Sequence, residues 1–348
     1  MKLVRDREEW NRLVKSFPNW DIYYLYEYVR SLELHGDGSP ALLYWKGTKM
    51  EICYAVMLQD IAAFEGFYGS LKRGRFFDMT TPYGYGGPLI KGEADKEDVG
   101  RFVRDLEEEC RRQNIVSQFF RFDPLVAGQN AFFKLFEAKS FKDTVYMDLE
   151  SEAVIVKNMD PKNRNMVRKA RKNNVQIFSD SGEHLEDFIR IYNVTMERNQ
   201  AEEYYYFKQD YFEYLQRELK DHMVYFYAVW EGKIISAAMF FYNENFMHYH
   251  LSGTLWEYRK LASVNLLLYE AALWGSRRGI KKLHLGGGME KDDSLYGFKK
   301  QFNRNGAVPF TIGRYIFDPE AFRELVKKRA EADRSFDASR PFLIQYRG

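Results

Sequence analysis

The spacing of apolar and polar residues in the first half of the chain predicts alternating helices and strands. Residues 7–17 and 94–113 have apolar side chains at helical intervals, the second after an acidic start. The phenylalanine-rich segment 129–140 also predicts a helix, and residues 22–34 fit neither period. Short apolar runs bounded by turn residues predict strands at 40–47, 50–59, 115–122 and 143–150, and residues 76–90 predict strand, loop and strand.

The second half repeats this alternation of helices and strands. Helices are predicted at 161–173, 183–199, 211–220 and 262–279, with a three-stranded meander over 223–253. A strand at 281–287, a helix at 294–302, a strand at 310–317 and a charged terminal helix follow. The closing units, 94–150 and 262–317, have the same order of elements, and the Phe133-Lys134 pair falls where Phe298-Lys299 does.

We therefore predict an α/β protein with mixed sheets, built from two tandem copies of a unit of ordinary domain size. The first domain covers residues 1–150 and is completed by the C-terminal helix of 318–348. The second covers 151–317.

Composition and charge narrow the class of protein. The 52 basic and 50 acidic residues nearly cancel, so an anion site must come from local clustering. Two cysteines form neither a disulfide framework nor a zinc pattern, which fits a reducing compartment. No signal core occurs, and no apolar run approaches the length that spans a membrane. We expect a cytoplasmic protein without stable membrane insertion.

The sequence LHLGGG followed by MEKDDSLYGFKKQF, residues 283–302, is the first candidate site. Its spacing fits neither a phosphate loop nor a dinucleotide fingerprint. Glycines 286–288 would weaken a strand end unless the backbone needs positive φ or close approach, although a flexible loop with exposed acids is the simpler interpretation. Lys299 lies beside Phe298 and Phe302, where its ammonium would be partly desolvated.

Two further segments could bind ligands. PYGYGGPL, residues 82–89, is either a tightly packed hairpin loop or a set of exposed amides with two phenols. In residues 160–173, Asp160 and Pro161 predict a helix start. Arg164, Arg168 and Arg171 then share one face, which with Lys169 favours anion or RNA binding over a merely solvated surface.

Histidine patterns do not predict a metal site. His248 and His250 lie on one face of a strand, and no third ligand stands at a known spacing, so a place in the core or lining a cleft is favoured. No nucleophile elbow or Ser/His/Asp pattern occurs.

These motifs resemble the Fem-type non-ribosomal peptidyltransferases, which consist of two GNAT-like acyltransferase domains in tandem. LGGG with DDSLYGFKKQF is similar to that family's closing signature, and PYGYGGPL to its Gly-Pro loop. DPKNRNMVRKARKNNVQI and NVTMERN resemble the opening of its second domain. The resemblance covers most of the chain in the right order.

The resemblance implies transfer of an aminoacyl group from aminoacyl-tRNA to an amine of a cell-wall precursor. Lys299 would stabilise the tetrahedral oxyanion, with Phe298 and Tyr296 shaping the channel and Asp293 or Asp292 as the candidate base. Neither a metal nor a cofactor is expected, because the acyl donor is a co-substrate. The substrate-binding residues would be Arg30, Tyr83, Tyr85, Gly86, Gly87, Arg198, Lys208, Gly286, Gly287 and Gly288.

The chain departs from the family at two places. Where some members have a second phosphate-contacting arginine, residues 201–208 offer only Lys208, which puts a UDP-linked muropeptide acceptor in doubt. Residues 259–264 lack the glycines of the CoA-binding signature. Two alternatives stay open: an acyl-CoA-dependent N-acyltransferase acting on an amino sugar or glycan, and a non-catalytic tandem GNAT protein that binds a nucleotide-linked ligand or tRNA.

Overall fold

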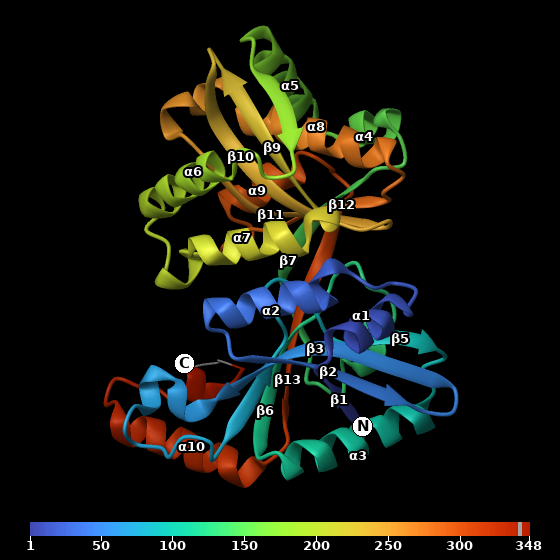
Figure 1. The fold of residues 1–348 in the computed structure, drawn as a ribbon, viewed down its shortest axis with the longest axis vertical. Helices are drawn as coiled ribbons and strands as arrows, with labels where there is room; N and C mark the ends of the chain where they lie inside the picture. Colours follow the sequence, from blue (N-terminus) through green and yellow to red (C-terminus); the bar gives the residue numbers. More distant parts are fainter. Residues whose placement is uncertain (340–342) are drawn as a thin grey trace. The chain divides into compact units, whose positions relative to one another are not determined.

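The computed structural model describes residues 1–339 and 343–348 and divides into two compact units (Figure 1). The first comprises Met1–Phe141 and Phe310–Gly348, and the second Lys142–Pro309. These bounds differ from the expected ones because residues 142–150 belong to the second unit and residues 310–317 to the first. Within the described residues, no helix has the length and apolarity to cross a lipid bilayer.

The first unit is a mixed sheet with helices on both faces. Its strands run in the order β1-β2-β3-β4-β6-β13, with β5 beside β3. Among these pairs of described strands, β4–β6 is parallel and the others are antiparallel. Helices α1 and α2 lie over one face, and α3 and α10 over the other (Figure 1). The elements are β1 (Lys2–Val4), α1 (Arg7–Lys15), α2 (Tyr26–His35), β2 (Ser39–Lys46), β3 (Met50–Asp60), β4 (Phe77–Thr80), β5 (Leu89–Gly92), α3 (Lys96–Arg112), β6 (Ile115–Arg121), β13 (Ala307–Ile316) and α10 (Pro319–Ala332).

The second unit has the order β7-β12-β11-β10-β9-β8, and only β11–β12 is parallel. Alternation along β9 sends Phe226 toward Trp274 of α8 and Tyr225 toward Phe188 of α6, so both faces are apolar. The elements are β7 (Lys139–Asp148), α4 (Glu152–Asn158), α5 (Pro161–Lys172), β8 (Gln176–Asp180), α6 (Leu185–Arg198), α7 (Gln209–Glu218), β9 (Met223–Trp230), β10 (Lys233–Tyr242), β11 (Phe246–Thr254), α8 (Ser263–Arg277), β12 (Lys282–Gly287) and α9 (Ser294–Lys300).

The two sheets share one connectivity, in which a helix carries the chain to a parallel neighbour strand. In the first unit α3 precedes β6, and in the second α8 precedes β12. The closing strands are exchanged. β7 follows the first copy in sequence but pairs with β12, whereas β13 follows the second copy but pairs with β6.

One predicted helix is wrong. Residues 129–140 contain only a short 3-10 helix, Gln129–Phe132, before turns lead into β7. The segment has no side-chain cap, and phenylalanine is a mediocre helix former. Phe136 instead stacks on Phe120 of β6 with ring centroids 4.3 Å apart, so burial of the aromatic rings overrides the local pattern. Residues 22–34, which fitted neither period, form a 3-10 turn and α2.

Candidate active site of the second unit

Helix α9 positions the candidate lysine through its N-terminal cap. The Asp293 carboxylate accepts hydrogen bonds from the backbone amides of Tyr296 (2.8 Å), Met289 (2.6 Å) and Glu290 (3.0 Å). The carboxylate fixes both the first turn of α9 and the loop before it. Tyr296 and Lys299, three residues apart, then lie on the buried face of the helix.

Lys299 is a buried cation with a defined partner. Its side chain is only 9% exposed, and its Nζ donates to the carbonyl oxygen of Gly287 at 2.7 Å. The same nitrogen lies 5.9 Å from the ring centroid of Tyr249. Burial, with a smaller contribution from Lys142, lowers the pKa of Lys299 to about 8. The ammonium therefore stays mostly protonated at neutral pH, which suits a donor to a developing oxyanion.

The turn of Gly286, Gly287 and Gly288, the glycine turn, needs glycine at each of its three positions. A Cβ at Gly287 would lie 2.8 Å from the carbonyl oxygen of Asp143. Gly286 has φ +72°, in the left-handed region, and follows an irregularity in the pairing of β12 with β7. A Cβ at Gly288 would lie 2.0 Å from Oδ1 of Asp293, so a side chain there would displace the cap. The turn thus brings the backbone close enough for the Asp293 carboxylate to bind its amides. The flexible-loop alternative does not account for this close fit.

Lys142, a residue that the sequence analysis missed, holds the same turn. Its Nζ donates to the carbonyls of Gly288 at 2.6 Å and Met289 at 3.0 Å. Burial also lowers the pKa of Lys142. Two ammonium groups therefore hold three successive carbonyls of one turn. No local pattern in the strand residues 139–148 indicates this role, because the partners are distant in sequence.

Strands β11 and β12 part close to Lys299. Their parallel pairing covers only residues 246–248 and 282–284, although β11 continues to Thr254 and β12 to Gly287. Within the described residues, β11 and β12 do not pair with each other beyond His248 and His284, although their edges still face one another there. An extended acyl chain can pair with such an edge. Tyr249, which contacts Lys299, lies on β11 at the parting point.

The histidines near this point are buried in the sheet. The Nε2 of His284 lies 2.9 Å from the hydroxyl of Thr144, and the rings of His248 and His284 meet edge to face. Burial lowers the pKa of His284 well below its ordinary value and that of His250 to about 3, so both are neutral. No cluster of three metal-binding side chains occurs among the described residues.

Asp293 is poorly suited to the role of a base. Its three backbone amide donors hold the pKa of the carboxyl below the ordinary value, so it has little affinity for a substrate proton. Asp292 is exposed, with φ +57°. The geometry gives Asp293 a positioning role.

In the first unit, loop 82–89 is a packed structure. The amide of Gly86 donates to Arg121 O at 2.8 Å, and its carbonyl accepts from Gln129 Nε2 at 2.9 Å. Gly87 has φ +87°, and a Cβ there would lie 2.9 Å from the Phe122 ring. The Gly86 amide is therefore used within the fold and Gly87 is closely packed, which favours the tight-loop alternative over a set of exposed donors. Tyr83 and Tyr85 remain half-buried.

The basic helix α5 is capped by Asp160, as predicted, but its arginines are not equivalent. Arg164 donates to the carbonyls of Val156 and Met159, which ties α5 to α4. Arg171 pairs with Glu270 of α8 at 2.8 Å. Of the predicted anion-binding set, Arg168, Lys169 and Arg171 are exposed, Arg171 despite its ion pair, whereas Arg164 is partly buried.

The remaining predicted residues lie on separate elements. Arg30 of α2 forms an ion pair with Glu33 in the first unit. In the second unit, Lys208 is exposed at the start of α7, and the Arg198 guanidinium lies 4.9 Å from the ring centroid of Trp256.

Comparisons with known proteins agree with this fold. Residues 161–300, which include the glycine turn and Lys299, match the family described as an acetyltransferase (GNAT) domain. The crystal structure of FemX superposes with a TM-score of 0.67 at 14% identity, covering 93% of this chain and 99% of that one. A search of curated proteins finds no significant match.

Two other solved structures show the same architecture. One is a conserved protein of unknown function from Bacteroides thetaiotaomicron, with a TM-score of 0.60 at 9% identity over 88% of this chain and 96% of that one. The other is the C-terminal domain of a putative lysylphosphatidylglycerol synthetase from Agrobacterium fabrum, with a TM-score of 0.56 at 12% identity over 89% and 92%. The chain therefore has the tandem GNAT-like fold of the Fem type, which confirms the predicted fold class and the resemblance.

Proposed function

We propose that the protein is an N-acyltransferase that moves an aminoacyl group from an activated ester, aminoacyl-tRNA, to an amine of an envelope precursor. The observation that carries the proposal is the buried Lys299 ammonium, held on a capped helix beside the point where β11 and β12 part. A preorganised cation in a site shielded from water is the arrangement that stabilises an acyl-transfer oxyanion.

The chemistry requires little else from the chain. The acceptor amine attacks the ester carbonyl, a C–N bond forms, and the carbonyl oxygen becomes the oxyanion near Lys299. Collapse breaks the ester C–O bond, and the proton lost by the amine goes to the leaving ribose oxygen, directly or through water. An ammonium has three donors, and Lys299 uses one on Gly287, so the others can serve the oxyanion.

We propose an RNA ester rather than a CoA thioester as the donor, because the residues at the start of α8 favour it over CoA. Residues 259–264 lack glycine, Ala262 is left-handed with φ +58°, and the Ser263 hydroxyl is 2.8 Å from the hydroxyl of Ser236. The amides at this helix start therefore lack the glycines that would let a pyrophosphate approach closely. Among the structural neighbours, one is named for lysylphosphatidylglycerol synthesis, which also fits the aminoacyl class.

The acceptor is assigned by the resemblance to the Fem proteins, as an amine on a nucleotide-linked or glycan precursor. The half-buried Tyr83 and Tyr85 of the first unit are proposed to line its binding surface, and Arg30 to contact its phosphates.

The test is a transfer assay with purified protein. Aminoacyl-tRNA or acyl-CoA is incubated with a panel of amine acceptors, and the products are identified by mass spectrometry. We expect an amide product from aminoacyl-tRNA alone. Lys299→Met should lower turnover by at least 10²-fold, whereas Lys300→Met, a matched lysine on the same helix, should keep it. Product from acyl-CoA alone would establish the CoA-dependent alternative, and unchanged turnover in Lys299→Met would refute the proposed role of this lysine.

A further inference from the structure

Helix α9, which bears Lys299, is held at both ends, and its C-terminal contacts lie outside the site described above. Its start is fixed by the Asp293 cap. At its other end, the carbonyl oxygen of Gln301 accepts hydrogen bonds from the Asp160 amide at 2.9 Å and from Asn163 Nδ2 at 3.4 Å. Lys299 stands only two residues before Gln301, so these two bonds restrict the position of the lysine backbone.

The chain that leaves α9 is bound to the same stretch, residues 157–163, which we call the α4–α5 junction. The Arg304 amide donates to Asn158 O at 3.0 Å, and the Arg304 guanidinium donates to Lys157 O at 3.3 Å. Arg164 donates to two carbonyls at the end of α4, at 3.1 and 2.7 Å, which ties the two helices of the junction together. The end of α9 is therefore bound to a braced part of the fold.

Asn163 is a buried amide that a second buried amide orients. Its side chain is fully buried, and Asn265 of α8 is 9% exposed. Asn265 Nδ2 donates to Asn163 Oδ1 at 2.7 Å, which leaves the Asn163 Nδ2 group directed at Gln301. The core around this pair contains apolar side chains of both helices, among them Val167 and Leu266. Burying two amides there costs free energy that apolar side chains would not, so stability alone does not account for the pair.

We propose that Asn163, oriented by Asn265, is a positioning residue that holds α9 so that the Lys299 ammonium stays beside the point where β11 and β12 part. This inference rests on the proposed function, in which that ammonium stabilises the oxyanion. A misplacement of about 1 Å lowers an enzymatic rate by roughly 10²-fold. Because the Asn163 side chain is fully buried, substrate does not reach it, and substrate affinity should not depend on it.

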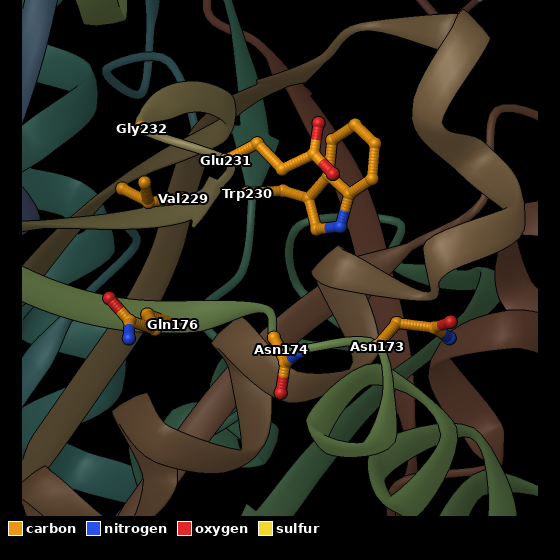
Figure 2. Close-up of a pocket in the computed structure, with 7 residues that line it drawn as sticks. All are labelled: Asn173, Asn174, Gln176, Val229, Trp230, Glu231 and Gly232. Atoms are coloured by element: carbon orange, nitrogen blue, oxygen red, sulfur yellow. The ribbon is translucent and has the colours of Figure 1, made fainter.

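An asparagine at the other end of α5 provides the matched control. Asn173 closes the helix, and its Nδ2 donates to a carbonyl of the last turn at 2.8 Å. Its side chain lies at a surface hollow of about 280 Å³, which the amides of Asn174 and Gln176 also line (Figure 2). Asn173→Ala therefore removes a side-chain hydrogen bond from the same helix, at the end away from Gln301.

Three variants separate positioning from stability in the transfer assay and in urea unfolding. Asn163→Leu removes the donor to Gln301 and leaves Asn265 Nδ2 without its partner, so both kcat and stability should fall. In the double variant Asn163→Leu with Asn265→Ala, neither amide remains and the combined volume is roughly kept, so stability should recover. Its kcat should stay about 10- to 10²-fold below that of the unmodified chain at an unchanged KM. Asn173→Ala should keep kcat.

A second measurement does not depend on transfer. In protein labelled with ¹³C at the lysine Cε atoms, the NMR signal of Lys299 is the one that Lys299→Met lacks. If α9 loses its position, the ammonium becomes better solvated, and its pKa rises from about 8 toward the ordinary value of 10.5. We expect this rise in Asn163→Leu and in the double variant, and no rise in Asn173→Ala.

The outcomes separate this inference from the proposed function. A double variant that regains both stability and full kcat would show that the amide pair serves folding alone, and the inference would be overturned while the proposed function stands. An unchanged pKa of Lys299 in Asn163→Leu and in the double variant would also overturn it. If the unmodified protein transfers no aminoacyl group, the proposed function fails, and a raised pKa of Lys299 in the double variant would still support the role of Asn163 in placing this lysine.

Discussion

Replacing Lys299 by methionine should make the protein more stable at neutral pH while removing its activity. The side chain is 9% exposed, so its charge is held in a poorly solvated site. Methionine has a similar length and no charge. The substitution therefore removes the cost of burying an ammonium along with one hydrogen bond to Gly287.

The structure gives the size of this effect. The pKa of Lys299 falls from 10.5 to about 8, mainly because the side chain is buried. Each unit corresponds to about 1.4 kcal/mol, so keeping the lysine charged in the fold costs roughly 3 kcal/mol at pH 7. The lost hydrogen bond offsets about 1 kcal/mol of this. We expect the variant to gain about 2 kcal/mol in free energy of unfolding.

The sign of the pH dependence follows from the same shift. The folded-state pKa lies below the unfolded one, so the unfolded chain binds more protons between about pH 8 and 10.5. The stability of the unmodified chain therefore gains from this group as the pH rises through that window. The difference in free energy of unfolding between Lys299→Met and the unmodified chain should therefore shrink by roughly 2 kcal/mol between pH 7 and about pH 9.5.

Urea unfolding followed by tryptophan fluorescence at both pH values measures the difference, and equal m-values would show that the same surface is exposed. Lys300→Met, from the less buried face of α9, should stay within about 0.5 kcal/mol of the unmodified chain. A Lys299→Met variant that is less stable at pH 7, or whose advantage does not change with pH, would refute the argument from burial.

Three further substitutions test other parts of the structure. Lys142→Met should lower turnover about 10-fold or more because the glycine turn loses two bonds, and Lys142→Arg should restore part of it in the transfer assay. Gly288→Ala should displace the Asp293 cap, costing about 1 kcal/mol in urea unfolding and most of the activity. Arg347→Met leaves the Asp78 carboxylate buried without its ion pair, which should cost about 3–5 kcal/mol. Normal stability of this variant would contradict that account.

Features encoded within a few neighbouring residues were predictable. Asp293 precedes Tyr296 by the three residues that a cap needs, and Asp160 with Pro161 marks the start of α5. The predicted meander agrees with β9, β10 and β11 because alternation and turn residues are local properties. The resemblance of the closing motif to the Fem proteins singled out Lys299, and its phenylalanine neighbours predicted the burial that the structure confirms.

The role of each basic residue was less predictable, because a charge in the sequence does not reveal its partner. Arg164 and Arg171 share a helical face with Arg168, yet the first caps carbonyls and the second pairs with Glu270.

The sequence by itself determined the order of elements, the duplication and the capped helix that bears Lys299, because helix caps, periodicity and turns depend on neighbours along the chain. Only the tertiary structure decided that β7 and β13 exchange places and that Lys142 reaches a turn 146 positions away. The tertiary structure also gives different surroundings to the two Phe-Lys pairs. Lys134 after Phe133 is exposed, whereas Lys299 after Phe298 is buried with a lowered pKa. Burial and strand pairing depend on contacts distant in sequence, which local patterns do not encode.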